Sequence, residues 1–204
     1  LFTAKLTGME VRYLKMHGTG NLILVVDQRE TNLPPPDPAQ LRILGNEATG
    51  PGFDQLMWIA PAEKSNAAAS YRVFNADGSE VQQCGNGVRC VASYLADGNA
   101  QNLTLQSPAG DIGARVADDG LVSVSMGTPS FAPASLPFDA QQPADHYTIN
   151  VDGEDHEIHV VSMGNPHCVL RVGNVENAPV TTLGPKIEAH PRFPERTNVG
   201  FMQS

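Results

Sequence analysis

Cys84 has the surroundings in this chain that best suit chemistry. It lies in QQCGNG (82–87), directly before a stretch that is expected to be helical. The N-terminus of a helix carries unpaired N–H groups and a partial positive charge, which stabilise a thiolate. Small residues leave those N–H groups open to a carboxylate. The segment therefore predicts a thiolate base beside a carboxylate-binding turn, and the alternative is a cysteine at a helix cap without a role.

The other two cysteines are interpreted as packing residues. Cys90 lies in the middle of the expected helix, and Cys168 lies in the strand-like HCVL. No His or second Cys stands at a zinc-like CxxC spacing, so no metal is expected. Three cysteines also make a poor disulfide framework, which favours a reduced, cytoplasmic protein.

Four further polar turns share one composition, with an asparagine beside glycine, proline or another small residue at a strand end. They are HGTGN (17–21), FNADGSE (74–80), GNPH (164–167) and RTNVGF (196–201). Asparagine offers a donor and an acceptor without charge, so the set would suit a zwitterion with ammonium and carboxylate groups. A single such turn indicates only tolerance of unusual backbone angles. His167 could either orient a substrate group or be structural.

The elements that must position these residues follow from apolar periodicity and turn residues. Helices are expected in AQLRILGNEATG (39–50), NGVRCVASYLADG (86–98) and TTLGPKIEAH (181–190). Val88, Val91, Ala92 and Leu95 would form one buried helix face. Strands are expected around a glycine turn in 11–27 and in 52–60, 71–78, 102–107, 111–117, 121–127, 146–151, 156–164 and 167–175.

This pattern divides the chain into three parts. Residues 9–128 form a first half that carries Cys84, the Pro/Ala-rich stretch 129–145 is a linker, and 146–204 form a second half. The second half stops before any helix equivalent to 86–97, so we expect it to be incomplete in this chain. Met9 is a candidate start, with residues 1–8 an added or upstream segment.

Charge and composition exclude two classes of partner. The net charge of −9 argues against nucleic acid, which needs a basic surface. No apolar run approaches the roughly 18 residues of a membrane span, and no secretory signal is recognised. A small-molecule ligand is expected, and the oligomeric state is open, with a homodimer as one expectation.

The sequence resembles the diaminopimelate epimerase family. The matching segments are KMHGTGN (15–21), GFDQL (52–56), FNADGSEVQQCGNGVRC (74–90), VVSMGNPHCV (160–169) and RFPERTNVGFMQ (192–203). The resemblance implies an α/β (α+β) fold of two pseudo-symmetric halves, each a curled, mostly antiparallel sheet around a central helix. It implies interconversion of LL- and meso-2,6-diaminopimelate in lysine and peptidoglycan precursor synthesis, without pyridoxal phosphate, metal or any other cofactor.

The resemblance also implies roles for individual residues. Two cysteines act from opposite faces of the α-carbon, and Cys84 matches the one that takes the proton as a thiolate. The other belongs to an ACGxG-type turn downstream of RTNVGF, beyond Ser204, so the chain as it stands should not catalyse. His167 would lie beside the site. The residues implied to bind substrate are Asn21, Gln55, Asn75, Gly85, Asn86, Asn165 and Asn198.

The chain departs from the family pattern in two places. Leu22 stands where the family usually has Asp after HGxGN, and GNEATGPG (45–52) is atypical before GFDQL. Three alternatives stay open: a proline- or hydroxyproline-type racemase of the same fold, a non-catalytic binding homologue, and a thiol hydrolase that uses Cys84 with His167.

Overall fold

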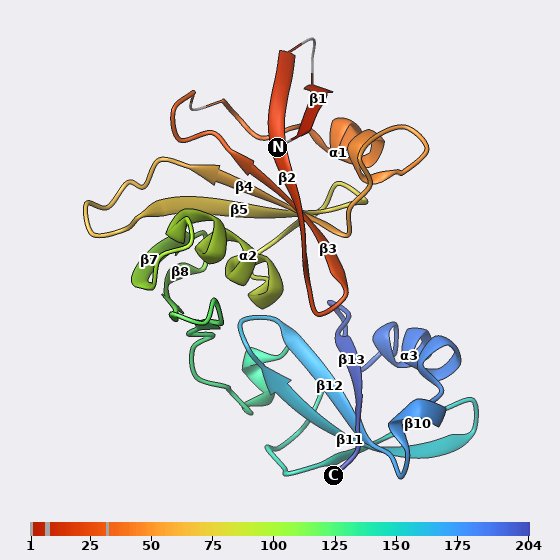
Figure 1. Cartoon of the computed structure of the whole chain (residues 1–204). Coiled ribbons are helices and arrows are strands. Elements are labelled where there is room, and N and C mark those ends of the chain that lie inside the picture. The colour runs from red at the N-terminus through yellow and green to blue at the C-terminus, as the bar shows by residue number, and fades with distance from the viewer. Residues whose placement is uncertain (1, 7–8, 32) are drawn as a thin grey trace. The chain divides into compact units, whose positions relative to one another are not determined.

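The computed structural model describes residues 2–6, 9–31 and 33–204 and divides the chain into two compact units, 1–126 and 127–204 (Figure 1). Each unit combines a sheet with few helices, which confirms the predicted α+β class. The described residues contain no helix that is both long and apolar enough to cross a membrane.

The first unit is built on one nine-stranded sheet. Its order is β1-β2-β3-β4-β5-β7-β8-β9, with β6 paired to β5, and all pairs are antiparallel except β3–β4 and β5–β7. The strands are β1 (Phe2–Leu6), β2 (Met9–Gly18), β3 (Asn21–Asp27), β4 (Gln55–Ala60), β5 (Ala69–Asn75), β6 (Glu80–Val81), β7 (Gln101–Ser107), β8 (Gly110–Val116) and β9 (Val122–Val124).

Helix α2 (Gly85–Ala96) packs against this sheet (Figure 1). It contacts strands in both halves of the sheet order, β2 to β4 and β7 to β9. Val88, Val91 and Ala92 are fully buried, while Leu95 is partly buried. The predicted helix face is therefore confirmed. The helix ends where Asp97 adopts a left-handed conformation with φ of 47°, directly before Gly98.

Helix α1 (Pro38–Gly45) belongs to a second core in the same unit. Asp37 caps its first turn by accepting the Gln40 N–H, and the Gln40 side chain accepts the Asp37 N–H in return. Leu41 and Leu44 are buried with apolar side chains of β3, β4 and β5. The sheet is thus covered by α2 and by α1.

The second unit has a four-stranded sheet in the order β10-β11-β12-β13. Its elements are β10 (Tyr147–Val151), β11 (Glu154–Ser162), β12 (Pro166–Arg171), α3 (Val180–Glu188) and β13 (Asn198–Met202), with 3-10 turns at Pro133–Ser135 and Val175–Asn177. The stretch 129–145, predicted to be a linker, contributes Leu136 and Phe138 to the core of this unit.

The two units repeat one topology. In the first, the antiparallel strands β1-β2-β3 are followed by α1 and then by β4, parallel to β3. In the second, β10-β11-β12 are followed by α3 and then by β13, parallel to β12. Consequently Gln55 and Asn198 hold equivalent places, since each is the first residue of the parallel strand.

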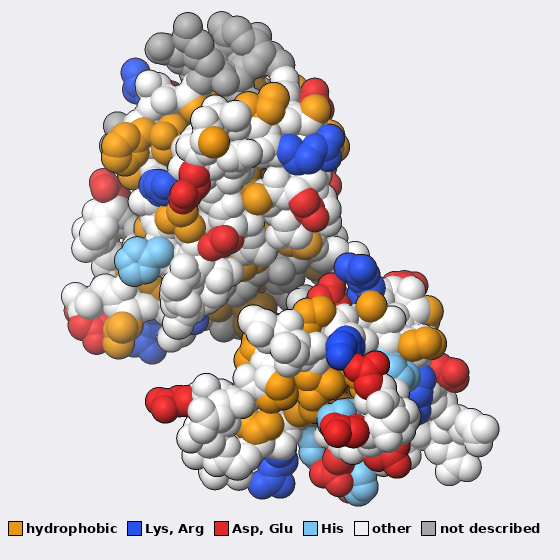
Figure 2. All heavy atoms as spheres, turned by 90° about the vertical axis from the view of Figure 1, so that its right-hand side faces the viewer, with side chains coloured by type: hydrophobic (Ala, Val, Ile, Leu, Met, Phe, Trp, Pro, Cys, Tyr) orange, Lys and Arg blue, Asp and Glu red, His pale blue; other side chains and the backbone are white. Residues whose placement is uncertain are grey.

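On the face of the molecule drawn in Figure 2, charged side chains of both signs are mixed. Acidic and basic side chains alternate there, and no large area is uniformly basic. Together with the net charge of −9, this surface offers a poor match for a phosphate backbone.

Candidate active site

Cys84 is the N-cap residue of α2, with an extended backbone at φ −145° and ψ 105°. Its sulfur accepts the backbone N–H of Gly87 at 3.3 Å and donates its S–H to Gln55 Oε1 at 2.6 Å. The side chain is only partly buried. Sulfur therefore faces both a donor and an acceptor, as a group that alternates between thiol and thiolate requires.

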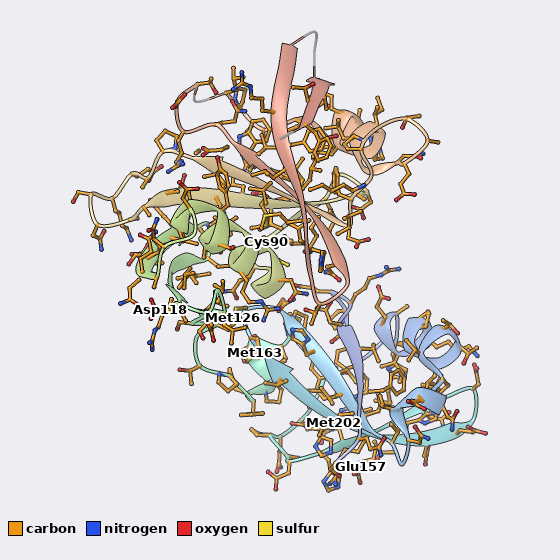
Figure 3. The ribbon with its side chains drawn as sticks, in the orientation of Figure 1. Cys90, Asp118, Met126, Glu157, Met163 and Met202 are labelled. Carbon is orange, nitrogen blue, oxygen red and sulfur yellow. The ribbon has the colours of Figure 1, made fainter. Side chains whose placement is uncertain are left out.

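The start of α2 leaves donors free beside this sulfur. Among residues 2–6, 9–31 and 33–204, the backbone N–H groups of Gly85 and Asn86 form no hydrogen bond. A Cβ at Gly85 would lie 3.2 Å from the sulfur of Met126, labelled in Figure 3. Two open N–H groups at a helix N-terminus are suited to bind a carboxylate.

The β2–β3 turn is tied to the same end of α2. Thr19 Oγ1 donates to Asn86 Oδ1 at 2.9 Å, and Arg89 donates to both Thr19 Oγ1 (3.3 Å) and Asn86 Oδ1. A Cβ at Gly18 would lie 3.0 Å from Asn86 Cβ, so the turn needs glycine there to approach this closely. Asn21, the first residue of β3, pairs with Gly18 and is thereby held near Asn86.

Gln55 and Asn75 complete the group in the first unit. They are register partners at the ends of β4 and β5, and Gln55 Nε2 donates to Asn75 Oδ1 at 3.3 Å. Both are partly buried. The structure thus brings Cys84, Gly85, Asn86, Gln55 and Asn75 together.

The three predicted residues of the second unit also lie at strand ends. His167 Nε2 and Asn165 Oδ1 form a hydrogen bond of 2.9 Å. Asn198 is the register partner of His167, and its Nδ2 donates to Pro166 O at 3.0 Å. Burial lowers the pKa of His167 below its ordinary value of 6.5.

Cys90 and Cys168 are packing residues, as predicted. Cys90, labelled on α2 in Figure 3, is 4% exposed, and burial is the main cause that raises the pKa of its thiol. Cys168 is 0% exposed, and burial raises its pKa to about 12. Neither thiol is available as a base near neutral pH.

Several residues that support the site were not predicted individually. Thr19, Asp77 and Ser79 lie inside polar turns that the sequence did single out, and Arg89 lies in the expected helix 86–98, but none of the four was assigned a role. At Leu22, the residue that departs from the family pattern, only the backbone is used: its N–H donates to Asp54 Oδ2 at 2.7 Å.

A second group of polar residues lies in the first unit, away from Cys84. A cavity of about 720 Å³ is lined by Arg12, Asp27, Arg29 and Tyr94 among others, and Tyr94 lies toward the opposite end of α2 from Cys84. Within the parts of the chain that the structure describes, no three His, Cys, Asp or Glu side chains are grouped as metal ligands would be.

The fold is similar to that of solved proteins described as an epimerase and a probable racemase. It is similar to a hydroxyproline epimerase from Agrobacterium vitis, with a TM-score of 0.61 and 18% identity over 92% of this chain and 64% of that one. A probable proline racemase from Agrobacterium radiobacter K84 gives a TM-score of 0.64 and 18% identity over 94% of this chain and 66% of that one. The chain spans less than two thirds of both.

Sequence similarity places the chain in one family. The family described as diaminopimelate epimerase matches residues 13–132 and 159–204. Diaminopimelate epimerases of Ectopseudomonas mendocina (strain ymp) and Azotobacter vinelandii (strain DJ / ATCC BAA-1303) are each 46% identical, over 200 and 198 residues. These matches cover 96% of this chain and 71% of each relative. The chain belongs to the diaminopimelate epimerase family.

Proposed function

We propose that this chain supplies the Cys84 side of an enzyme that interconverts LL- and meso-2,6-diaminopimelate without a cofactor. The observation that carries the proposal is the sulfur at the start of α2, which meets the Gly87 N–H and the Gln55 amide oxygen. Family membership supports diaminopimelate as the substrate, because the family and the relatives are named diaminopimelate epimerase.

Proton abstraction is the difficult step, because the α-proton of an amino acid is a very weak acid. The Cys84 thiolate would take this proton and become a thiol, and the electron pair would stay on the α-carbon and its carboxylate. The open N–H groups of Gly85 and Asn86 would bind that carboxylate and stabilise its growing negative charge. Fixed donors of this kind replace the electron sink that a cofactor would provide.

Inversion requires an acid on the opposite face of the α-carbon. This acid donates a proton to the carbanion, while Cys84 keeps the proton that it has removed. Cys90 and Cys168 do not fit this role, since both are buried within the cores of their units. The identity of the acid is therefore an expectation from the family resemblance, which implies a second cysteine in a turn downstream of RTNVGF.

Polar side chains would hold the rest of the zwitterion. We assign this role to Asn21, Gln55 and Asn75 in the first unit and to Asn165 and Asn198 in the second. Their uncharged amides can donate to carboxylates and accept from ammonium groups. His167 would orient Asn165 through the hydrogen bond between them.

The proposed setting is lysine and peptidoglycan precursor synthesis in the cytoplasm. All three cysteines are free thiols, as a reducing compartment would keep them. Whether the protein forms a homodimer stays a prediction, to be checked by its mass in solution.

The test is Cys84→Ser in the full-length protein, with Cys90→Ala as the matched control. We expect Cys84→Ser to lower kcat by about 10²–10⁴-fold, the usual contribution of a general base, while the circular dichroism spectrum stays unchanged. Exchange of the α-proton of LL-diaminopimelate with deuterated water measures the step directly. Retention of most of the activity would refute the role of Cys84.

A substrate comparison separates this function from the nearest alternative. The same exchange assay is run with LL-diaminopimelate, L-proline and trans-4-hydroxy-L-proline. We expect exchange with diaminopimelate only, and preferential exchange of either cyclic amino acid would identify a racemase of the proline type instead.

A further inference from the structure

We propose that Ser79 and Asp77 are positioning residues that determine which end of the Gln55 amide faces the sulfur of Cys84. The inference rests on the role proposed above for Cys84 and extends it to two residues that do not touch this sulfur. It follows from a continuous series of side-chain hydrogen bonds.

The series begins at a carboxylate on the surface and ends at the sulfur. Ser79 Oγ donates to Asp77 Oδ1 at 2.6 Å, and Asn75 Nδ2 donates to Ser79 Oγ at 3.0 Å. Gln55 Nε2 donates to Asn75 Oδ1 at 3.3 Å, and Cys84 Sγ donates to Gln55 Oε1 at 2.6 Å. Each side chain therefore contacts the next without interruption.

The direction of every bond in the series follows from its first member. An ionised carboxylate has no hydrogen and can only accept, so the single hydrogen of the Ser79 hydroxyl must point to Asp77. The Ser79 oxygen is then left to accept, and Asn75 must turn its NH₂ group toward it. Asn75 consequently presents its oxygen to Gln55, which turns its NH₂ to Asn75 and its own oxygen to Cys84.

Ionisation of Asp77 is itself supported by the turn. The hydrogen bonds from the Ser79 hydroxyl and backbone N–H lower the pKa of the Asp77 carboxyl below its ordinary value. Asp77 is therefore charged at neutral pH and keeps its acceptor-only character.

The backbone of the turn holds Asp77 and Ser79 in place. Asn75 N–H donates to Ser79 O at 2.8 Å, and Gly78 N–H donates to Asn75 O at 3.0 Å. Gly78 has a φ of +90°, and a Cβ there would lie 2.6 Å from Pro38 O. The turn is thus closed on itself and backed by the start of α1.

The consequence concerns the state of the sulfur before substrate binds. An amide oxygen accepts the S–H of a thiol but repels a thiolate, whereas an NH₂ group would do the reverse. An Asn or Gln amide has nearly the same shape in both orientations, so its partners select one. Ser79 and Asp77 thereby hold Cys84 as a thiol until Gln55 is engaged elsewhere.

The experiment measures the resting sulfur rather than turnover. Full-length Ser79→Ala and Asp77→Ala are compared with wild type for the rate of Cys84 alkylation by iodoacetamide at fixed pH without substrate. The S–H stretching band of Cys84, assigned by its loss in Cys84→Ser, is recorded by infrared spectroscopy. Asp77→Ala removes the acceptor of the Ser79 hydroxyl, which is then free to donate to Asn75.

We expect both variants to speed alkylation about 2- to 10-fold, the range that loss of one hydrogen bond produces. The S–H band should shift toward that of a thiol without an acceptor. Ser79→Thr keeps the hydroxyl and should restore both readouts. Ser70→Ala is the matched control, since Ser70 lies on β5, the strand that ends at Asn75, but donates to Pro61 O at 2.9 Å and is outside the series.

Unchanged or slower alkylation in Asp77→Ala, which tests the series even if Ser79→Ala fails to fold, would overturn the proposal. So would an equal effect of Ser70→Ala, or no rescue by Ser79→Thr. These readouts do not depend on epimerase activity. Failure of the proposed function, seen as an active Cys84→Ser enzyme, would therefore be distinguished from failure of this inference.

Discussion

At the scale of single residues, the three cysteines occur in two different environments. Cys84 lies at a helix start with polar partners, while Cys90 and Cys168 are buried among apolar side chains. Composition around each cysteine was sufficient to predict this difference, because glutamines and glycines cannot form an apolar cavity. The polar partners of Cys84 therefore support the chemistry proposed for it, which the other two cysteines lack the surroundings to perform.

The first prediction at this scale concerns alkylation. With iodoacetamide near neutral pH, the folded protein should be labelled at Cys84 well before Cys90 and Cys168. Burial raises the pKa of both buried thiols and also blocks access to them. Peptide mass spectrometry over time measures the three rates, and unfolding in urea should equalise them. Equal rates in the folded protein would argue against a special environment for Cys84.

The second residue-scale prediction concerns pH and His167. Because burial lowers its pKa below 6.5, the unfolded chain takes up this proton more readily than the folded chain. Above about pH 6.5 His167 is neutral in both states and does not lower the free energy of unfolding. As the pH falls from there through the lowered pKa, protonation favours the unfolded chain and the protein loses stability. His167→Gln should lose less stability than wild type between pH 7 and pH 5. Urea titrations at both pH values test this, and an identical loss would contradict it.

At the scale of elements, the position of Cys84 depends on how closely α2 approaches the sheet. Gly87 is buried, and a Cβ there would overlap Met57 Sδ of β4. The same residue donates the N–H that reaches the Cys84 sulfur. Gly87 therefore serves two purposes: it lets α2 pack closely against β4, and its N–H holds the Cys84 sulfur.

Gly87→Ala should therefore destabilise the protein by about 1–3 kcal/mol, the usual cost of overpacking. An ordinary helix position would instead gain about 1 kcal/mol from this change. Gly113→Ala in β8 is the control, because the nearest atom to a Cβ there is 3.9 Å away. Thermal unfolding of both variants measures the difference. A neutral or stabilising Gly87→Ala would show that the Met57 side chain or α2 can move aside without cost.

Elements with strong local patterns could be predicted from sequence, and those without could not. The amphipathic α2 and the apolar β3 and β4 were predicted near their observed places. Two strands were not predicted: β6, which has only two residues, and β13, whose sequence NVGFM follows a polar turn. β13 becomes a strand through parallel pairing with β12, about 30 residues earlier, and no local signal reports such a partner.

The same limit applies to the site. Residue types within turns marked Asn75, Asn86 and Asn165 as candidates, yet their partners depend on the fold. Thr19 meets Asn86 and Arg89 across sequence separations of 67 and 70 residues. Motifs thus indicate which residues belong to the site, while only the three-dimensional structure shows which of them hold one another.

At the scale of the whole molecule, the two units share a topology but have separate cores. The stretch 129–145 lacks periodicity, so its sequence favoured a linker. Two side chains nevertheless anchor it to the second unit: Leu136 is 0% exposed, and the ring of Phe138 lies 4.8 Å from those of Tyr147 and Phe193. Isolated apolar residues in a Pro-rich stretch give no periodic signal, which explains why sequence alone did not reveal this packing.

Leu136→Ala tests whether this segment is part of the second core. Removing a fully buried leucine should cost about 2–5 kcal/mol, and the loss should fall on the second unit. Phe131→Ala in the same segment is the control, since Phe131 is 62% exposed. Hydrogen exchange measured by mass spectrometry should show faster exchange in β10 to β12 of Leu136→Ala. Amides of α2 should keep their protection, because α2 belongs to the core of the first unit. Equal loss of protection in α2 would mean that the two cores unfold as one, and the residues around Cys84 would then depend on packing at Leu136.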